Sequence, residues 1–245
     1  MLHYIYDGSF NGLLTAIHEI YYRRQIPQQL LPCGTSTPQL FVQQEEIVTD
    51  DNKAAKVYDA IYYKISPQAL RHTYYAYLAE HLEAGIWVYQ YLNLGWKLGS
   101  KADMLLSEER VHRIHRLGQK VSMERHRLLG LVRFQLLQKD IYYAAIEPDH
   151  NVVELMAPHF ARRMADQNWV IHDLRRNLAA VYNQNEWVST HFTQLHKLEL
   201  ANEEQYYQKL WKHYYDNIAI SSRINPRLQK RCMPQRYWKH LVEKN

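Results

Sequence analysis

The apolar pattern of this chain changes its period close to Leu129. Before that point apolar residues recur about every 3.6 residues, the spacing of amphipathic helices, most clearly over residues 107–129. After it, residues 131–137 and 141–146 have the pattern of two strands joined by a short turn at 138–140. This order predicts an α+β fold, in which a helical lobe packs with a small, mainly antiparallel sheet.

The same patterns predict the other elements. We expect strands at 3–6, 40–48, 169–172 and 178–182, helices at 10–21, 53–64, 66–98, 152–164 and 203–217, and a proline-containing loop at 25–39. The 245 residues, 47% of them hydrophobic, suffice for one domain with a substantial core. We expect a single domain with two lobes: a helical lobe at about 53–129, and an α+β lobe formed by 1–52 and 130–245. The N-terminal strand is a candidate to join the sheet of the second lobe.

Aromatic residues are frequent in two of the expected helices. The helix at 66–98 carries seven tyrosine and tryptophan rings, for which core packing is favoured over stacking on nucleobases. The helix at 203–217 is amphipathic, and its spacing predicts an inner face made of Tyr207, Leu210, Trp211, Tyr214 and Ile218.

Positive charge is concentrated in the last residues, 223–245, which we call the tail. The tail holds seven Lys and Arg against one acid, a net charge of +6, whereas the whole chain has only +5. Cations mixed with flat rings suit a polyanion that carries stackable bases. The tail residues predicted to contact nucleic acid are Arg223, Arg227, Lys230, Arg236, Tyr237 and Trp238. The alternative for Tyr237 and Trp238 is that their rings anchor the tail in a groove of the fold.

A second basic surface is expected on the helix at 107–129. With about 100° per residue, four cations fall within about 60° of one another on this helix. They are Arg113, Arg116, Lys120 and Arg127, and the apolar residues occupy a different face. These cations are either a solvated face or a row of phosphate contacts that extends the basic tail.

The densest polar cluster lies in the second half of the chain. Glu147, Asp149, His150 and His159 are weak candidates for catalysis, because a carboxylate beside a histidine can transfer protons or bind a metal. Their spacing matches no compact metal motif, and histidines at helix caps and strand ends are usually hydrogen-bonded parts of the structure. We therefore expect no metal and no cofactor.

Several other classes are disfavoured. The chain lacks a nucleophile elbow, a phosphate-binding Walker loop, a dinucleotide-binding fingerprint and a zinc-deaminase pattern. Cys33 and Cys232 are too few for a cluster held by three thiolates. No basic start with an apolar run, and no stretch of about 18 apolar residues, is present, so we expect no signal peptide, no membrane contact and a cytoplasmic location.

Several blocks resemble a known bacterial family. The most specific block is Glu147-Pro148-Asp149-His150-Asn151-Val152 followed by Ala157-Pro158-His159-Phe160-Ala161. Further blocks are Tyr6-Asp7-Gly8-Ser9-Phe10, Ile65-Ser66-Pro67, Leu94-Gly95 and the segment from Trp211 to Trp238. The chain is similar, nearly end to end, to proteins labelled probable DNA metabolism or DNA repair proteins, otherwise a domain of unknown function.

The resemblance implies a role and partners, but no catalytic residues. Members of the family occur beside a radical-SAM protein, and some relatives are fused to a uracil-DNA-glycosylase-like domain. The resemblance thus implies a DNA-repair accessory protein whose partners are DNA and these two proteins. A hydrolase or lyase for damaged DNA, and an adaptor that binds protein alone, remain the alternatives. The chain departs from the family pattern at His172, where a tyrosine is expected, and at Ser221-Ser222, where relatives tend to be acidic.

Overall fold

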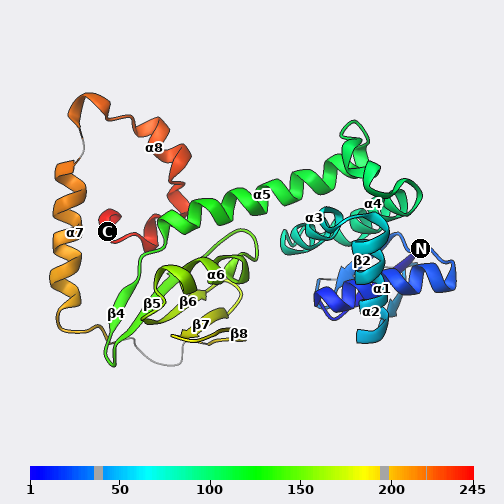
Figure 1. The fold of residues 1–245 in the computed structure, drawn as a ribbon, viewed down its shortest axis with the longest axis horizontal. Coiled ribbons are helices and arrows are strands. Elements are labelled where there is room, and N and C mark those ends of the chain that lie inside the picture. Colours follow the sequence, from blue (N-terminus) through cyan, green and yellow to red (C-terminus); the bar gives the residue numbers. More distant parts are fainter. Residues whose placement is uncertain (36–40, 194–198, 219) are drawn as a thin grey trace. The chain divides into compact units, whose positions relative to one another are not determined.

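The chain folds into two compact units. The structure, a computed structural model, describes residues 1–35, 41–193, 199–218 and 220–245. Unit 1 comprises Met1–Ser122 and unit 2 comprises Met123–Asn245, and helix α5 (Glu109–Leu131) contributes residues to both (Figure 1). This division differs from the expected lobes, because residues 1–52 belong with the helices that follow them and not with residues 130–245.

Unit 1 contains a small parallel sheet. Its strands are β1 (Leu2–Tyr6), β2 (Gln29–Pro32) and β3 (Gln43–Glu46), in the order β2-β1-β3. Both neighbours run parallel to the central strand β1, in which Tyr4 is fully buried. The expectation that the N-terminal strand joins the sheet of residues 131–183 is therefore wrong. β2 lies in the segment predicted as a loop, and its Pro32 is tolerated at the end of an edge strand.

Unit 1 also contains helices. They are α1 (Phe10–Arg23), α2 (Asp51–Ala60), α3 (Pro67–Leu78) and α4 (Ala84–Leu98), with the short π-helix η1 (Ile61–Ile65) and the 3-10 helix η2 (Gly99–Met104). Of these helices, α1 contacts β1 and α4 contacts β2. Two starts follow from the sequence, because Ser9 accepts a hydrogen bond from the Gly12 amide and Ser66, before Pro67, accepts one from the Ala69 amide. The predicted helix at 66–98 is two helices, since the chain turns at Glu80 with φ of 49°.

The rings of α3 and α4 contribute to the core of unit 1. Tyr91 and Tyr89 are buried, and Trp87 and Trp96 pack against the same cluster of apolar side chains. The predicted apolar face of α5 is also buried, with Val111, Ile114, Leu117, Val121 and Leu128. Core packing, and not base stacking, therefore accounts for the ring-rich segment.

Unit 2 is built on a mixed sheet of five strands. The strands are β4 (Gln135–Leu137), β5 (Ile141–Ile146), β6 (Asn168–Asp173), β7 (Leu178–Asn183) and β8 (Trp187–His191), in sequence order. All neighbours are antiparallel except β5 and β6, which run parallel because α6 (Val153–Arg163) crosses between them. The expected α+β class and mainly antiparallel sheet are thus confirmed, while β8 was not predicted.

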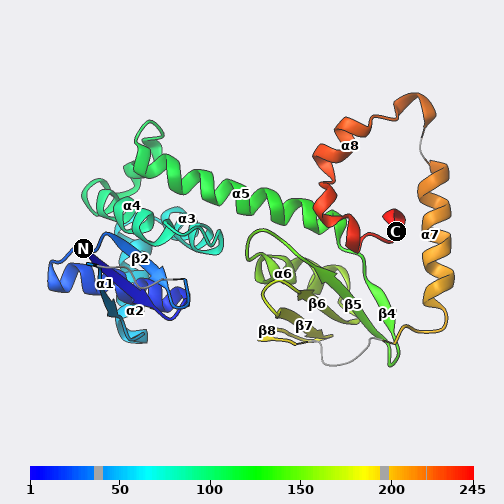
Figure 2. The ribbon, with the colours of Figure 1, turned by 180° about the vertical axis from the view of Figure 1, so that it is seen from behind.

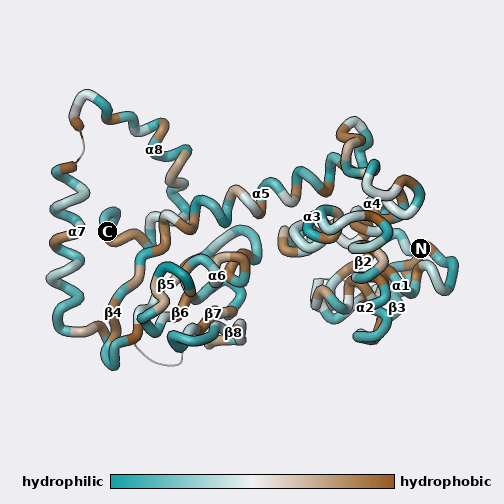
Figure 3. Tube along the Cα trace, in the orientation of Figure 1, coloured by the Kyte–Doolittle hydropathy of each residue, from teal (hydrophilic) through white to brown (hydrophobic). Residues whose placement is uncertain are grey.

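Helix α6 packs on β6, β7 and β8 (Figure 2). The contact is made by rings, with Trp169 fully buried and Phe160 and Phe134 packed edge-on near it. Hydrophobic residues are concentrated along β5 and β6, whereas hydrophilic residues dominate α7 (Glu204–Ile218) and α8 (Pro226–Cys232) in Figure 3. None of the described helices has an apolar stretch of the length that crossing a bilayer requires.

Helix α4 passes close to the backbone of strand β2 at Gly85. A Cβ atom at Gly85 would lie 2.6 Å from the Leu30 carbonyl oxygen, whereas one at Gly118 of α5 would meet Tyr75 at an ordinary 3.6 Å. We predict that Gly85→Ala lowers the free energy of unfolding by about 1–3 kcal/mol, since backbone must move. The matched control Gly118→Ala should leave stability unchanged or raise it by up to about 1 kcal/mol. Urea denaturation followed by circular dichroism measures both, and equal effects would contradict this packing.

Candidate functional site

A buried carboxylate organises the polar contacts of unit 2. Glu124 of α5 is 2% exposed. Its oxygens accept hydrogen bonds from the backbone amides of Asp149 at 2.9 Å and His150 at 2.8 Å. The His150 ring nitrogen Nδ1 and the Tyr237 hydroxyl also donate to it. A buried carboxylate is stable only when hydrogen-bond donors replace the water that it has lost. Because its four donors come from the loop after β5 and from the tail, Glu124 of α5 joins these segments in one network.

These donors keep Glu124 ionised. Burial alone would raise its pKa, but hydrogen bonds from His150, Tyr237 and the Asp149 amide outweigh burial and lower the pKa to about 2. The folded pKa lies below the ordinary value of 4.5. The stabilisation from the ionised form is therefore complete above pH of about 4.5 and is lost as the pH falls toward 2.

The end of the tail is anchored by the same network. Arg236 lies 3.0 Å from the Asp149 carboxylate and donates to the Tyr237 hydroxyl at 2.8 Å, and Lys239 forms an ion pair with Glu147. Tyr237 is buried, and its pKa is raised by burial and by the hydrogen bond to Glu124. These contacts place the Tyr237 ring in the fold and give Arg236 and Lys239 carboxylate partners of their own.

Trp238 is also held by intramolecular contacts. Its indole nitrogen donates to the Met233 carbonyl at 2.9 Å, and the Lys244 ammonium group lies 4.8 Å from its ring centre. The geometry therefore corresponds to anchoring, the alternative that the sequence left open for the two rings.

Three of the four weak catalytic candidates meet at this network. Glu147 is paired with Lys239, Asp149 with Arg236, and His150 with Glu124. His159 lies on α6, where its ring packs edge-on against Phe160 and its Nε2 atom is buried without a hydrogen-bond partner among the described residues. A hydrolase or lyase needs an acid or base that is free to act. Here the three groups that converge are engaged in ion pairs and caps.

The first half of the tail differs from its end. Arg223, Arg227, Lys230 and Arg231 are exposed, and none has a carboxylate partner within the parts of the chain that the structure describes. Asn225 caps α8 by accepting from the Leu228 amide, and Pro226 occupies the first helical position. Positions 227, 230 and 231 are spaced i, i+3 and i+4, so Arg227, Lys230 and Arg231 share one face. We call these three residues the α8 cluster.

The predicted basic stripe of α5 is divided between the units. Arg113, Arg116 and Lys120 belong to unit 1, and Arg127 belongs to unit 2. Arg113 forms an ion pair with Glu109 and lies over the Trp87 ring, whereas Arg116 and Lys120 are exposed. Arg127 is half-buried. The predicted cationic contacts that belong to unit 2 are thus Arg127, Arg223, Arg227, Lys230 and Arg236, while Arg231 was not predicted.

An aromatic groove lies beside α7, in a position that the sequence did not reveal. The groove has a volume of about 910 Å³. Its aromatic and cationic lining comprises Arg133, Phe134, Tyr142, Tyr207, Trp211 and Tyr214. The predicted inner face of this helix is not buried, since Tyr207 is 56% exposed, Trp211 39% and Tyr214 53%. α7 packs against β4 and the short 3-10 helix η5 (Val242–Lys244).

Two residues that line the groove donate hydrogen bonds to Glu243. The Glu243 carboxylate accepts from Arg133 at 2.6 Å and from the Trp211 indole nitrogen at 2.9 Å. The Arg133 guanidinium lies 5.2 Å from the Trp211 ring centre, which is a cation–π distance. Sequence spacing could not show this arrangement because its three members lie on different elements, far apart in the chain.

A second, polar pocket adjoins the aromatic groove. It has a volume of about 350 Å³ and shares Arg133, Gln208 and Val242 with the groove. Lys212 and Lys239 add two further cations to its lining, and His240 adds an imidazole. No carboxylate side chain lines this pocket among the described residues. Arg133 and Lys239 are paired with Glu243 and Glu147, and Glu203 and Glu204 also line the groove, so Lys212 is the pocket cation without a carboxylate side-chain partner among the described residues.

Residues 83–243 match the sequence profile of a family described as a domain of unknown function (DUF4130). The chain belongs to this family. The matched segment of the DUF4130 family contains Glu124, the loop at 147–150, α7 and the tail as far as Glu243. It does not cover residues 1–82, whereas the predicted resemblance ran nearly end to end. No curated protein matches the chain.

Loss of the Glu124 charge tests the network directly. We predict that Glu124→Gln lowers the free energy of unfolding by about 3 kcal/mol, since a buried ion pair and its donors lose their partner. The exposed Glu186 of the same unit provides a matched control, and Glu186→Gln should change stability by less than about 0.5 kcal/mol. In urea denaturation between pH 7 and pH 3, the difference between wild type and Glu124→Gln should shrink as the pH falls. A difference that grows on acidification would contradict the assignment.

Proposed function

We propose that this protein is a cytoplasmic accessory factor of DNA repair or DNA metabolism that binds single-stranded nucleic acid through unit 2. The aromatic groove would take a base, the adjoining pocket a phosphate, and the α8 cluster the phosphates farther along the strand. The observation that carries this proposal is the exposure of Tyr207 and Tyr214 beside the Arg133 guanidinium. Base stacking on exposed rings next to a cationic track is the usual means of binding single strands without sequence preference.

The distribution of charge supports the choice of unit. Unit 1 has 12 Lys and Arg and 12 Asp and Glu, whereas unit 2 has 18 Lys and Arg and 13 Asp and Glu. The whole positive excess of +5 therefore belongs to the unit that carries the groove. Because the neutralisation of phosphates drives non-specific binding, a phosphate strand would be attracted to unit 2 and not to unit 1.

The proposed partners rest on the family resemblance. A radical-SAM protein and a uracil-DNA-glycosylase-like protein would supply the chemistry, and this chain would hold the strand for them. The block Glu147-Pro148-Asp149-His150, which carries the resemblance most specifically, forms the loop that donates to Glu124. The family block thus corresponds to the part of unit 2 that anchors the tail. An adaptor that binds only protein is the outcome if nucleic acid fails to bind.

The salt dependence of binding tests the phosphate contacts. We predict that the triple variant Arg227→Gln, Lys230→Gln, Arg231→Gln binds a labelled single strand of about 12 nucleotides more weakly. The slope of log K against log salt should become shallower by about 2, since up to three phosphate contacts are lost. Fluorescence anisotropy from about 50 to 200 mM salt measures this slope.

A control of equal charge makes the result specific. Lys56, Lys97 and Lys101 are exposed cations of unit 1, and their joint replacement by Gln removes the same charge from the chain. This control should keep the wild-type slope. Equal slopes for both triple variants would contradict the role of the α8 cluster, and a wild type that binds no strand at low salt would favour the adaptor.

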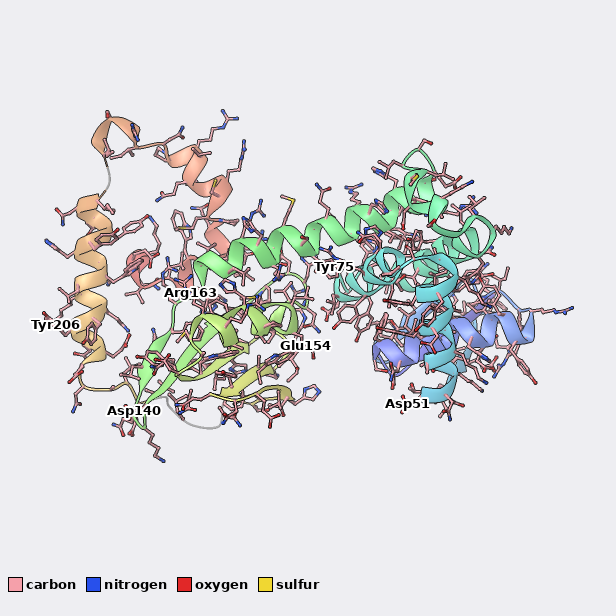
Figure 4. The ribbon with its side chains drawn as sticks, viewed as in Figure 1. Asp51, Tyr75, Asp140, Glu154, Arg163 and Tyr206 are labelled. Carbon is pink, nitrogen blue, oxygen red and sulfur yellow. The ribbon has the colours of Figure 1, made fainter. Side chains whose placement is uncertain are left out.

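Stacking in the groove has its own test. We predict that Tyr214→Ala weakens binding by about 5- to 100-fold at every salt concentration without changing the slope, since a ring and no charge is removed. Tyr206 lies on the same helix, is 62% exposed and is absent from the groove lining (Figure 4). Tyr206→Ala should therefore bind within about twofold of wild type in the same titration. An equal loss in both variants would show that the rings act through α7 stability and not through stacking.

A further inference from the structure

Three potential metal ligands that the proposed function does not use converge in unit 1. His72 comes from α3, Asp103 from η2 and His115 from α5. Asp103 Oδ1 lies 3.3 Å from His72 Nδ1 and 3.4 Å from His115 Nε2. All three ligand atoms lie within 4.8 Å of one another, and the two imidazole ring centres are 4.2 Å apart. Two histidines and one carboxylate are a common ligand set for transition metals.

The spacing of these atoms matches four-coordinate geometry. Zinc bonds of about 2.0–2.1 Å at tetrahedral angles place neighbouring ligand atoms about 3.3–3.4 Å apart. Octahedral bonds of similar length, as for magnesium, would place them about 2.9 Å apart. The distances of 3.3 and 3.4 Å from Asp103 Oδ1 to the two histidine nitrogens agree with the tetrahedral value. We propose that His72, Asp103 and His115 bind a zinc ion with three protein ligands.

Hydrogen bonding alone accounts poorly for the cluster. The Tyr91 hydroxyl already donates to Asp103 Oδ1, and the two histidine nitrogens approach the same oxygen at distances well beyond the usual 2.7–2.9 Å of a charge-assisted bond. Three donors would then crowd one oxygen atom, two of them making long contacts. A metal ion resolves the crowding, because it accepts the lone pairs of both imidazoles and of the carboxylate at once.

Surrounding side chains orient the three ligands as a metal site requires. Gln68 Nε2 lies 3.0 Å from His72 Nε2, the ring nitrogen opposite the ligating one. Rotation of the Gln68 amide would let its oxygen accept a hydrogen bond from that nitrogen when Nδ1 binds the metal. Ser66 donates to the second Asp103 oxygen at 3.3 Å, so the carboxylate is held at both atoms.

The site retains access to solvent. The side chains of His72, Asp103 and His115 are 17%, 15% and 25% exposed. Water can therefore occupy the fourth position of a tetrahedral ion. Three protein ligands with an open position are typical of zinc that binds an exchangeable ligand, whereas structural zinc is usually enclosed by four. No metal motif is visible along the chain because the three ligands come from separate elements.

A matched pair of histidines on α5 allows a decisive test. His115 is a proposed ligand, and His112, three residues earlier on the same helix, is exposed and outside the cluster. The full chain, free of any affinity tag, would be stripped with a chelator and titrated with zinc chloride against a fluorescent zinc indicator. Wild type and His112→Gln should bind one zinc per chain with equal affinity. His115→Gln should bind it at least about 100-fold more weakly.

Cobalt provides an independent readout of geometry. Cobalt bound to wild type and to His112→Gln should show the intense visible absorption of a tetrahedral ion, which His115→Gln should lose while its far-ultraviolet circular dichroism stays unchanged. Zinc affinity that is equal in all three proteins would overturn the proposal, as would a wild type that binds less than one zinc per chain. A loss of folded signal in His115→Gln would be checked with His72→Gln, for which the same loss of zinc binding is expected.

Discussion

The arrangement of unit 2 depends on the burial of one carboxylate. Helix α5 carries Glu124, and two backbone amides, one imidazole and one phenol donate hydrogen bonds to its carboxylate. Removing a carboxylate from water costs several kcal/mol, and these donors offset that cost only if the loop and the tail are both in position. Glu124 therefore couples the end of the chain to the end of β5, although the two are about ninety residues apart.

This coupling divides the basic tail into two parts with different roles. Arg236 and Lys239 pair with Asp149 and Glu147 and stabilise the fold, while the α8 cluster remains exposed. The anchored end also positions Glu243, which holds Trp211 at the edge of the aromatic groove. Charge counted along the sequence therefore overstates what the tail offers to a polyanion, and under the proposed function the exposed rings of α7 would add a stacking surface.

Sequence patterns predicted the elements of this fold better than their assembly. The helix starts at Ser9 and Ser66 and the strands on both sides of the turn at 138–140 were predicted because their signals are local. The turn at Glu80 carries neither glycine nor proline, so one helix was predicted where two exist. The contacts of the polar side chains could not be predicted from the sequence. The partners of Glu124, and the residues that meet at Asp103, come from elements far apart in the chain, so no sequence spacing indicates these contacts.

Amide hydrogen exchange across the tail measures the central claim, that Glu124 anchors one part of the tail and leaves the other free. Exchange reports the local free energy of opening, residue by residue. The account predicts slow exchange for the amides of 235–241 and fast exchange for those of 226–232. Addition of single-stranded DNA should slow exchange at 204–218 and 226–232 and leave 235–241 unchanged. Uniformly fast exchange from 223 to 245, or protection by DNA confined to 235–241, would contradict it.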